Sequence, residues 1–223
     1  MKLLKHLAII LDGNRTWARE QGKPEFMGHT QGAKNIQTIV KAVIEHDIEV
    51  LSMYVLSTEN LKNRSQSELK HLFSLFEKLI DYKNLFQENN IKLQISGDLS
   101  ALPDSVQQSM NNLLDQTSEH TGLILNLCMN YGGRDEIIRA IKKLPDTQSV
   151  TEESFAKHLD SGNLPDVDLV IRTSGHQRIS NFLLWKLAYA EMYFPKVHWP
   201  AFCPQDLEDA IDYYNSTNRK FGK

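Results

Sequence analysis

Five short apolar runs recur along the chain, and no other feature limits its possible folds as strongly. Most of the runs are nearly continuous in hydropathy rather than alternating, which is typical of β-strands that are buried on both faces. The runs lie at 6–11, 50–57, 91–96, 123–129 and 168–173. We therefore predict a parallel sheet that other elements cover on both sides.

Segments with helical periodicity separate these runs. Apolar residues recur at helical spacing in 30–47, and they do so again in 65–88 after a capping-box start. Further helices are predicted over 104–119, 134–144, 151–160, 179–193 and 204–219, with a surface connection near 145–165. This alternation predicts a single α/β domain over residues 1–223, with a mainly parallel sheet flanked by helices.

The charge balance excludes a global attraction for nucleic acid or for an anionic membrane. The chain has 25 Lys and Arg residues against 28 Asp and Glu residues, a net charge of -3. No apolar stretch approaches the ~18 residues that suggest a transmembrane helix. Cys128 and Cys203 are expected to be unpaired thiols of a cytoplasmic protein. Any anion must then be bound by local groups, and any membrane contact must be peripheral.

Polar residues follow the predicted strands, where ligands collect in sheets of this kind. The turn Asp12-Gly13-Asn14 comes directly after the first strand. Its backbone amides suit an anion and the Asp12 carboxylate suits Mg²⁺, although a turn without a ligand has the same composition. Gly28 and His29 precede a predicted helix, where they are either anion-binding groups or an ordinary helix start.

The densest polar group follows the fifth strand. Arg172, Arg178 and Ser180 lie there among other hydroxyl residues, a set that suits a diphosphate. The chain has 17 lysines but only 8 arginines, and five arginines follow strands: Arg15, Arg64, Arg134, Arg172 and Arg178. The chain contains neither a Walker-type loop nor a Gly-x-Gly-x-x-Gly motif, which argues against nucleotide hydrolysis and against a dinucleotide site. No cluster of Cys and His residues has the spacing of a zinc site. Mg²⁺ is therefore the expected metal.

Several stretches resemble the cis-prenyltransferase family, of the undecaprenyl diphosphate synthase type. They are HLAIILDGNRTWA (6–18), GHTQG (28–32), STEN (57–60), LNLCMNYGGRDEI (125–137), DLVIRTSGHQRISNFLLWKLAYAEMYF (168–194) and NRKFG (218–222). The resemblance runs in register from about residue 6 to 222.

The resemblance implies both a reaction and a fold. The enzymes condense isopentenyl diphosphate with an allylic diphosphate such as farnesyl diphosphate, with Mg²⁺, to make a Z-polyprenyl diphosphate such as undecaprenyl diphosphate. The implied fold is a central, mostly parallel six-stranded sheet surrounded by helices, in a homodimer. A long lipid product would bring the protein into peripheral contact with the membrane.

The resemblance also implies roles for individual residues. Asp12 and Asn60 match catalytic residues, with Glu59 beside Asn60, and Asp12 and Glu191 match metal ligands, Glu191 reaching the metal of the partner subunit. The residues that match the allylic diphosphate site are Gly13, Asn14, Arg15, Trp17, His29 and Arg64. Those that match the isopentenyl diphosphate site are Arg172, Arg178 and Ser180, and residues 219–222 match a tail that closes over the neighbouring site.

Five positions depart from the family pattern. Thr16 and Glu25 stand where arginines are common, which should weaken allylic diphosphate binding unless Arg15 substitutes. His176 replaces a glutamate and is expected to make isopentenyl diphosphate binding sensitive to pH. The other two departures are Leu61, in place of tryptophan and followed by an arginine one residue late, and Lys220, in place of arginine.

The growing product requires an apolar tunnel, and its wall is expected among Val55, Leu75, Leu79 and Leu123, unless these residues only pack the core. Two other functions stay open at this point. The enzyme could make a short product or use an unusual primer, or the chain could be a non-catalytic partner subunit of the same fold.

Overall fold

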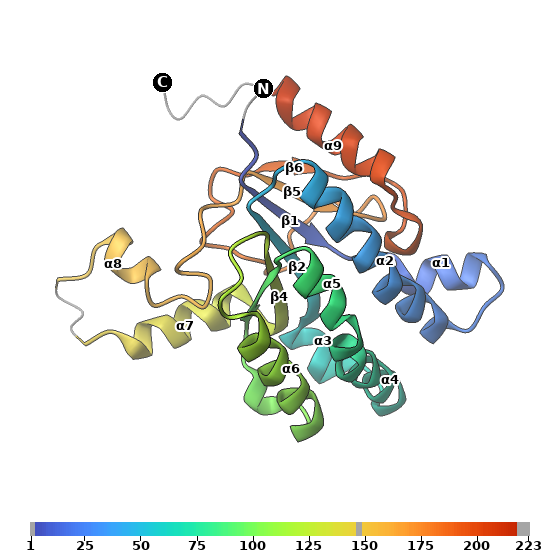
Figure 1. Ribbon diagram of the computed structural model, residues 1–223, viewed down its shortest axis with the longest axis horizontal. Coiled ribbons are helices and arrows are strands. Elements are labelled where there is room, and N and C mark those ends of the chain that lie inside the picture. The colour runs from blue at the N-terminus through green and yellow to red at the C-terminus, as the bar shows by residue number, and fades with distance from the viewer. Residues whose placement is uncertain (1–2, 146–148, 218–223) are drawn as a thin grey trace.

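The computed structural model describes residues 3–145 and 149–217, and a six-stranded sheet forms its centre (Figure 1). The strand order is β3-β4-β2-β1-β5-β6 and every pairing is parallel. The strands are β1 (His6–Ile10), β2 (Val50–Ser57), β3 (Lys92–Ser96), β4 (Ile124–Tyr131), β5 (Leu169–Arg172) and β6 (Glu191–Tyr193). The predicted α/β architecture is confirmed, and the five apolar runs form β1 to β5.

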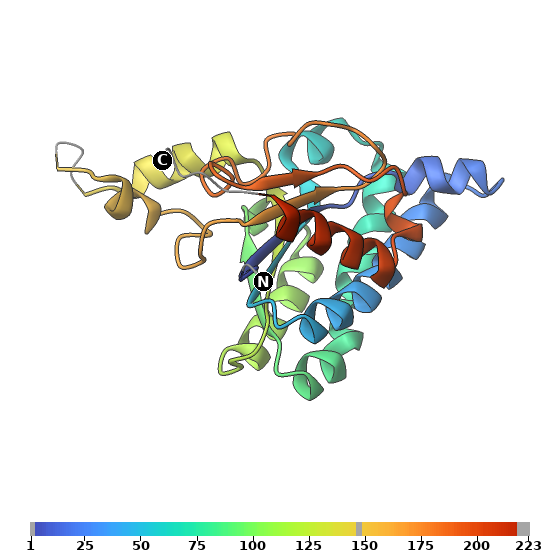
Figure 2. The same ribbon diagram turned by 90° about the horizontal axis from the view of Figure 1, so that it is seen from above.

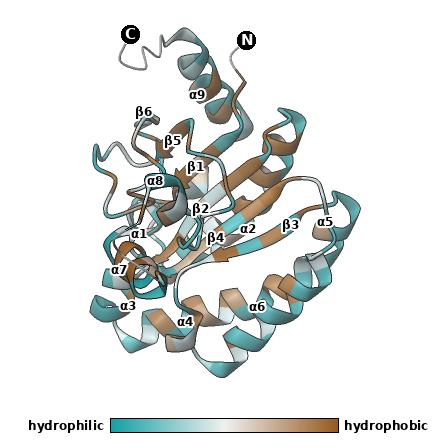
Figure 3. Cartoon of the chain, turned by 90° about the vertical axis from the view of Figure 1, so that its left-hand side faces the viewer, coloured by the Kyte–Doolittle hydropathy of each residue, from teal (hydrophilic) through white to brown (hydrophobic). Residues whose placement is uncertain are grey.

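Regular helices cover one face of the sheet. Its buried strand residues, such as Ile9 and Met53, pack against Val43, Met110 and Leu207 of three different helices. Figures 2 and 3 show this helical layer beside the sheet. The helices are α2 (Glu25–Glu45), α4 (Gln66–Glu77), α5 (Lys83–Glu88), α6 (Asp104–Thr117) and α9 (Pro204–Ser216). We call this side the helix-covered face.

Residues 173–190 cover part of the other face without forming a regular helix. Phe182, Leu183 and Leu187 are buried there against strand residues that include Ala8 and Val170. The helix predicted over 179–193 is therefore wrong. Ser180, Asn181 and Leu183 have φ of 48°, 63° and 38°, which a right-handed helix excludes. The end of the same segment forms β6, so the sixth strand lies where a helix was predicted. We call this side the loop-covered face.

The remaining helices agree only in part with the predicted ones. On the loop-covered side, α7 (Gly133–Lys143) agrees with its prediction and α8 (Glu152–Ala156) is shorter. The helix predicted over 65–88 is divided by a 3₁₀ segment, Lys78–Tyr82, between α4 and α5. Two short helices directly follow strands: α1 (Asn14–Glu20) and α3 (Thr58–Asn63). Short 3₁₀ turns occur at Leu99–Ala101 and Trp199–Ala201.

A line of buried polar side chains crosses four strands inside the apolar sheet. His6 Nδ1 lies 2.8 Å from the Pro165 carbonyl, and its Nε2 lies 2.7 Å from Ser52 Oγ. Asn126 donates to Ser52 Oγ at 2.9 Å and accepts from Ser96 Oγ at 2.9 Å. Since the carbonyl can only accept, His6 donates from Nδ1 and accepts at Nε2. Burial lowers the pKa of His6 to about 4 against the opposing effect of the Pro165 hydrogen bond, so His6 is neutral at pH 7.

The described residues include no helix with the length and hydropathy required to cross a membrane. Cys128 is buried and Cys203 is exposed, and both are free thiols, as expected.

Candidate active site

A cavity of about 630 Å³ opens at the carboxyl edge of the sheet, where β1, β2 and β5 end. Its polar lining includes Asp12, Asn14, His29, Glu59, Asn60, Arg64, Arg172, Ser180 and Asn181. Its apolar lining includes Ile36, Val55, Leu72, Leu75, Phe76, Leu79, Tyr82 and Leu127. Polar groups that come from separate strand ends thus face one cavity that also has an apolar wall.

Three of the four residues proposed for a tunnel wall, Val55, Leu75 and Leu79, line this cavity. Leu123 is instead part of the buried core. It directly precedes β4, so it lies at the amino edge of the sheet, opposite the cavity.

Asp12 follows β1 and is held by groups from three segments. Its Oδ1 accepts from the Gly13 amide at 2.8 Å, and its Oδ2 accepts from Arg172 Nη2 at 2.8 Å and Nε at 3.1 Å. His176 Nδ1 lies 3.1 Å from the same Oδ2. Burial acts to raise the pKa of Asp12, but the Arg172 hydrogen bonds and charge outweigh it and hold that pKa below its ordinary value. Asp12 is therefore ionised at neutral pH.

Arg172 ends β5 and joins Asp12 to the loop that follows. Only 6% of its side chain is exposed. Its Nη1 donates to Ser180 Oγ at 2.6 Å and to the Arg178 carbonyl at 2.5 Å. The structure thus brings Asp12, Arg172 and Ser180 together. Arg178 is exposed and contributes its carbonyl to this group.

Gly13 has a conformation and a location that only glycine fits. Its φ is 97°, in the left-handed region, and a Cβ there would lie 2.5 Å from His198 Nδ1. This residue turns the chain from Asp12 into α1. Asn14, the first residue of α1, lines the cavity and donates from Nδ2 to the Leu11 carbonyl at 2.9 Å.

His29, on α2, faces a carboxylate that α4 supplies. Its Nε2 lies 3.2 Å from Glu68 Oε1, and Arg64 Nη1 lies 3.3 Å from the same oxygen. Burial and the neighbouring Arg64 charge lower the pKa of His29 to about 4, although Glu68 opposes the shift. His29 is consequently neutral at pH 7 and donates to Glu68, since a carboxylate only accepts. Burial also lowers the pKa of Arg64 from its ordinary value.

Arg15 and Trp17 lie outside the main cavity. Arg15 Nε forms an ion pair with Glu25, and Arg19 lies 3.8 Å from the same carboxylate. Arg15 and Glu25 line a second hollow, of about 470 Å³, which shares His29 with the main cavity. Trp17 stacks under Lys23, whose Nζ is 4.9 Å from the ring centroid. Arg15 is therefore paired with Glu25, one of the five residues that depart from the family pattern.

Asn60 lies in α3, directly after β2, and both it and Glu59 line the cavity. The Asn60 amide donates to Ser57 Oγ at 3.0 Å, which caps the helix. Glu59 Oε1 accepts from Asn181 Nδ2 at 3.0 Å. Although burial acts to raise it, the pKa of Glu59 lies below its ordinary value because its own amide, Asn181, Thr58 and Ser57 hydrogen-bond the carboxylate.

Glu191 does not approach Asp12 along the sheet. It pairs with Leu169 at the start of β5, whereas Arg172 at the end of β5 pairs with Ile10. Among residues 3–145 and 149–217, no group of three His, Cys, Asp or Glu residues could hold a metal. Within one chain Asp12 and Glu59 are the carboxylates that line the cavity, and of these two Asp12 is the one that contacts Arg172. The predicted tail, residues 219–222 with Lys220, lies outside the described residues.

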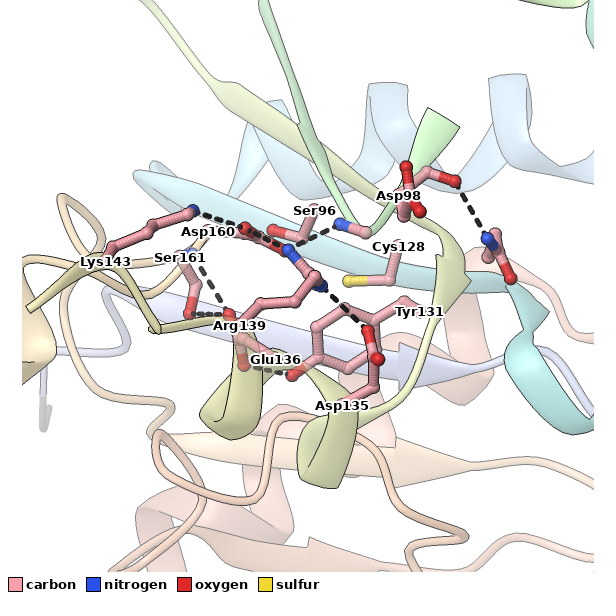
Figure 4. Close-up of polar contacts among 12 residues, drawn as sticks. Ser96, Asp98, Cys128, Tyr131, Asp135, Glu136, Arg139, Lys143, Asp160 and Ser161 are labelled. Carbon is pink, nitrogen blue, oxygen red and sulfur yellow. Dashed lines mark hydrogen bonds and ion pairs between the residues drawn. The ribbon is translucent and has the colours of Figure 1, made fainter. Parts of the chain in front are cut away.

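The turn after β4 is anchored from behind by α7 (Figure 4). The Tyr131 hydroxyl donates to Glu136 Oε2, and Ser161 donates to Oε1 from its amide at 3.3 Å and its hydroxyl at 3.2 Å. Arg139 donates to both oxygens of Asp160 at 2.7 and 2.6 Å. Burial raises the pKa of Glu136, while Tyr131 and Ser161 oppose that shift. These contacts fix the start of α7 against the end of β4.

Sequence reasoning did not single out Glu68 or Asn181 as site residues. Glu68 was assigned to the start of a helix, and the structure does place Ser65 Oγ as acceptor of its amide at 3.3 Å. Nothing local indicates that its side chain meets His29, 39 positions away. Asn181 ends the polar group after the fifth strand, but the helix predicted over 179–193 gave its side chain no role of its own.

Comparison with known proteins identifies consistent relatives. The family model of undecaprenyl diphosphate synthases matches residues 10–222. An isoprenyl transferase of Treponema denticola is 44% identical, covering 98% of this chain and 97% of that protein. A ditrans,polycis-undecaprenyl-diphosphate synthase, (2E,6E)-farnesyl-diphosphate specific, of Buchnera aphidicola subsp. Schizaphis graminum is 42% identical over 98% of this chain and 91% of its own length.

Solved structures give the same result for the fold. The lavandulyl diphosphate synthase of Lavandula x intermedia, in complex with dimethylallyl diphosphate, superposes with a TM-score of 0.94 at 33% identity. The match covers 98% of each chain.

Proposed function

The chain belongs to the undecaprenyl diphosphate synthase family of prenyltransferases, and we propose that it condenses isopentenyl diphosphate with an allylic diphosphate, farnesyl diphosphate or one similar, to make a Z-polyprenyl diphosphate such as undecaprenyl diphosphate. One observation carries this proposal above the others. A single cavity combines a mouth with Asp12, Arg172 and Ser180 and a wall of leucine and aromatic side chains. A diphosphate head and a prenyl chain require those two surfaces side by side.

The allylic diphosphate is assigned to the end of the cavity near α1 and α2. Its groups there are the backbone of residues 13–15, His29 and Arg64, with Trp17 and Arg15 nearby on α1. His29 and Arg64 approach the same Glu68 oxygen, so an incoming diphosphate would compete with Glu68 for both. The allylic diphosphate group must also lie close to Asp12, so that it can leave the allylic carbon there.

Isopentenyl diphosphate is assigned to the loop after β5. Arg172, Arg178 and Ser180 offer two guanidiniums and a hydroxyl, a set of donors that suits diphosphate oxygens. Arg172 already points at both Asp12 and Ser180. The nucleophilic double bond of isopentenyl diphosphate would then face the allylic carbon. Asn60 and Glu59 would lie beside the carbon that loses its proton.

Mg²⁺ fits the donor set at Asp12. This metal is commonly held by one or two carboxylates together with substrate phosphates, and 30% of the Asp12 side chain is exposed. Asp12 would hold the ion, joined by Glu191 from the partner subunit. When bound, Mg²⁺ supplies positive charge that stabilises the departing diphosphate. Chelation should abolish turnover, and added Mg²⁺ should restore it.

A homodimer is part of the proposal, since Glu191 can only reach a metal from the other subunit. The edge strand β6 supports it, because Tyr189 beside it is 68% exposed and Met192 within it is 38% exposed. Light scattering of the purified protein measures this assembly directly. We place the protein in the cytoplasm, with peripheral membrane contact through its lipid product.

A short product from an unusual primer is the second candidate function. The structural similarity to a lavandulyl diphosphate synthase, solved with dimethylallyl diphosphate, favours it. The long leucine-rich wall of the cavity favours chain elongation instead.

One assay separates these outcomes. The purified chain is incubated with Mg²⁺, radiolabelled isopentenyl diphosphate and allylic primers of different lengths, and the products are separated by chromatography. A ladder of elongated products from farnesyl diphosphate supports the first proposal, and a single addition to a short primer supports the second. Absence of incorporation by the chain alone would indicate a non-catalytic partner subunit and contradict both.

A further inference from the structure

Asn181 connects the segments that follow three different strands. We infer that it is a positioning residue, which fixes the isopentenyl diphosphate end of the cavity by tying Ser180 to the ends of β2 and β4. The inference rests on the proposed function, because it assigns Asn181 to a subsite of that reaction. Asn181 itself lines the cavity.

Three hydrogen bonds make the connection. The Asn181 carbonyl accepts from the Gly133 amide at 2.7 Å, and its Oδ1 accepts from the Arg134 amide at 2.9 Å. Its Nδ2 donates to Glu59 Oε1 at 3.0 Å. Asn181, in the loop after β5, is thus hydrogen-bonded to the first turn of α7 and to the first turn of α3.

The two glycines after β4 leave room for this connection. A Cβ on Gly132 would lie 2.8 Å from both Asn181 Nδ2 and Thr58 Oγ1. A Cβ on Gly133 would lie 2.6 Å from Leu184 Cγ. The Gly-Gly turn is therefore a docking place for residues 181–184, which explains this motif without an anion.

The connection reaches the substrate groups on both sides. Ser180, which directly precedes Asn181, has a φ of 48° and accepts from Arg172 Nη1 at 2.6 Å. Left-handed conformations of such residues persist only where neighbouring contacts impose them. On the other side, Glu59 adjoins Asn60. Releasing Asn181 would therefore remove a constraint on the backbone of Ser180 and one hydrogen bond of the Glu59 carboxylate at the same time.

An amide is the side chain that this place requires. Asn offers both a donor and an acceptor, whereas Asp offers only acceptors and would face the Glu59 carboxylate as a like charge. Asn181→Asp therefore removes the Glu59 bond while it keeps an acceptor for the Arg134 amide. Asn181→Ala removes both.

The test measures steady-state kinetics of the full-length protein with both substrates. Asn181→Asp should raise the KM for isopentenyl diphosphate about tenfold, the size expected for one hydrogen bond to a charged group. The KM for the allylic substrate should stay within about twofold, because no Asn181 contact reaches residues 13–15. The matched control is Asn163→Asp, which removes the 3.0 Å hydrogen bond from Asn163 Nδ2 to Gln94 Oε1. This bond lies away from the cavity, so the control should leave both KM values unchanged.

A double-mutant cycle keeps the inference testable if Asn181→Ala proves unstable. If Asn181 acts through Ser180, the effects of Asn181→Asp and Ser180→Ala on this KM should be clearly less than additive. Equal changes in both substrates' KM values, additivity in the cycle, or no change in Asn181→Asp would overturn the inference. An inactive wild-type protein would instead contradict the proposed function, so the two failures are distinguishable.

Discussion

The two faces of the sheet use apolar residues in different ways. On the helix-covered face, side chains such as Val43 and Met110 lie on regular helices, and their burial alone explains the packing. On the loop-covered face, Phe182 and Leu183 are equally buried, but they lie on a segment whose path is set by hydrogen bonds of Arg172 and Asn181. Periodicity predicts most of the first face. On the second, polar contacts hold the backbone in shapes that substrate groups need.

The comparison implies that chemistry depends on polar residues beside the loop-covered face. Asp12→Asn keeps the shape of that side chain but removes the charge that Arg172 faces, so turnover should fall at least about a hundredfold. Product formation from labelled isopentenyl diphosphate measures this. The control is Asp115→Asn, on the exposed side of α6, which should have no effect. Turnover of Asp12→Asn within about threefold of wild type would remove Asp12 from the mechanism.

A matched pair of core substitutions tests the comparison directly. Leu113→Ala lies on the helix-covered face and Leu183→Ala on the loop-covered face, and both side chains are fully buried. Each should lower the free energy of unfolding by about 3 kcal/mol, measured by denaturant titration. Only Leu183→Ala should also raise the KM for isopentenyl diphosphate, because Leu183 lies near Ser180. If both variants change this KM equally, the two faces do not differ in the way described.

Acid should destabilise the protein through His6. Its pKa is about 4 in the folded state against about 6.5 when unfolded. Between these values the unfolded chain binds more protons, so stability is complete above about pH 6.5 and falls as pH drops toward 4, by up to about 3 kcal/mol. Unfolding titrations at several pH values measure the slope. His6→Gln should be less stable at pH 7 but have a shallower slope in this window, and an unchanged slope would assign the acid sensitivity to other groups.

The smallest effect is expected at the pair on the rim of the second hollow. Glu25 holds Arg15 away from the main cavity, so Glu25→Gln should lower the KM for the allylic substrate about two- to fivefold, and Arg15→Ala should raise it. The control is Glu153→Gln, which breaks an exposed ion pair with Lys157 on α8. No change in either variant would mean that Arg15 does not substitute for the arginine missing at Thr16.

The sequence predicted the parts of the molecule in which neighbouring residues decide the structure. Strands β1 to β5 and helices α2, α6, α7 and α9 follow from hydropathy alone, and the clustering of polar residues at strand ends follows from parallel topology. The path of residues 179–190 did not, because Asn181 takes its conformation from partners more than 40 positions away, such as Arg134 and Glu59. The ion pair between Arg15 and Glu25 on the rim of the second hollow was likewise not predicted, because the closeness of Arg15 to Asp12 in sequence does not show where its side chain points.

The buried polar line through His6, Ser52, Asn126 and Ser96 has a consequence for how the strands find one another. A parallel sheet of continuous apolar strands loses little hydrophobic burial if one strand slides by two residues, so burial alone barely distinguishes aligned from misaligned chains. If any of these strands slid along its neighbour, a buried donor or acceptor would lose its hydrogen-bond partner, at a cost of about 1 to 3 kcal/mol for each group. The hydrogen bonds of these four residues therefore favour the native register of β1, β2, β4 and β3, a preference that hydrophobic burial alone does not supply.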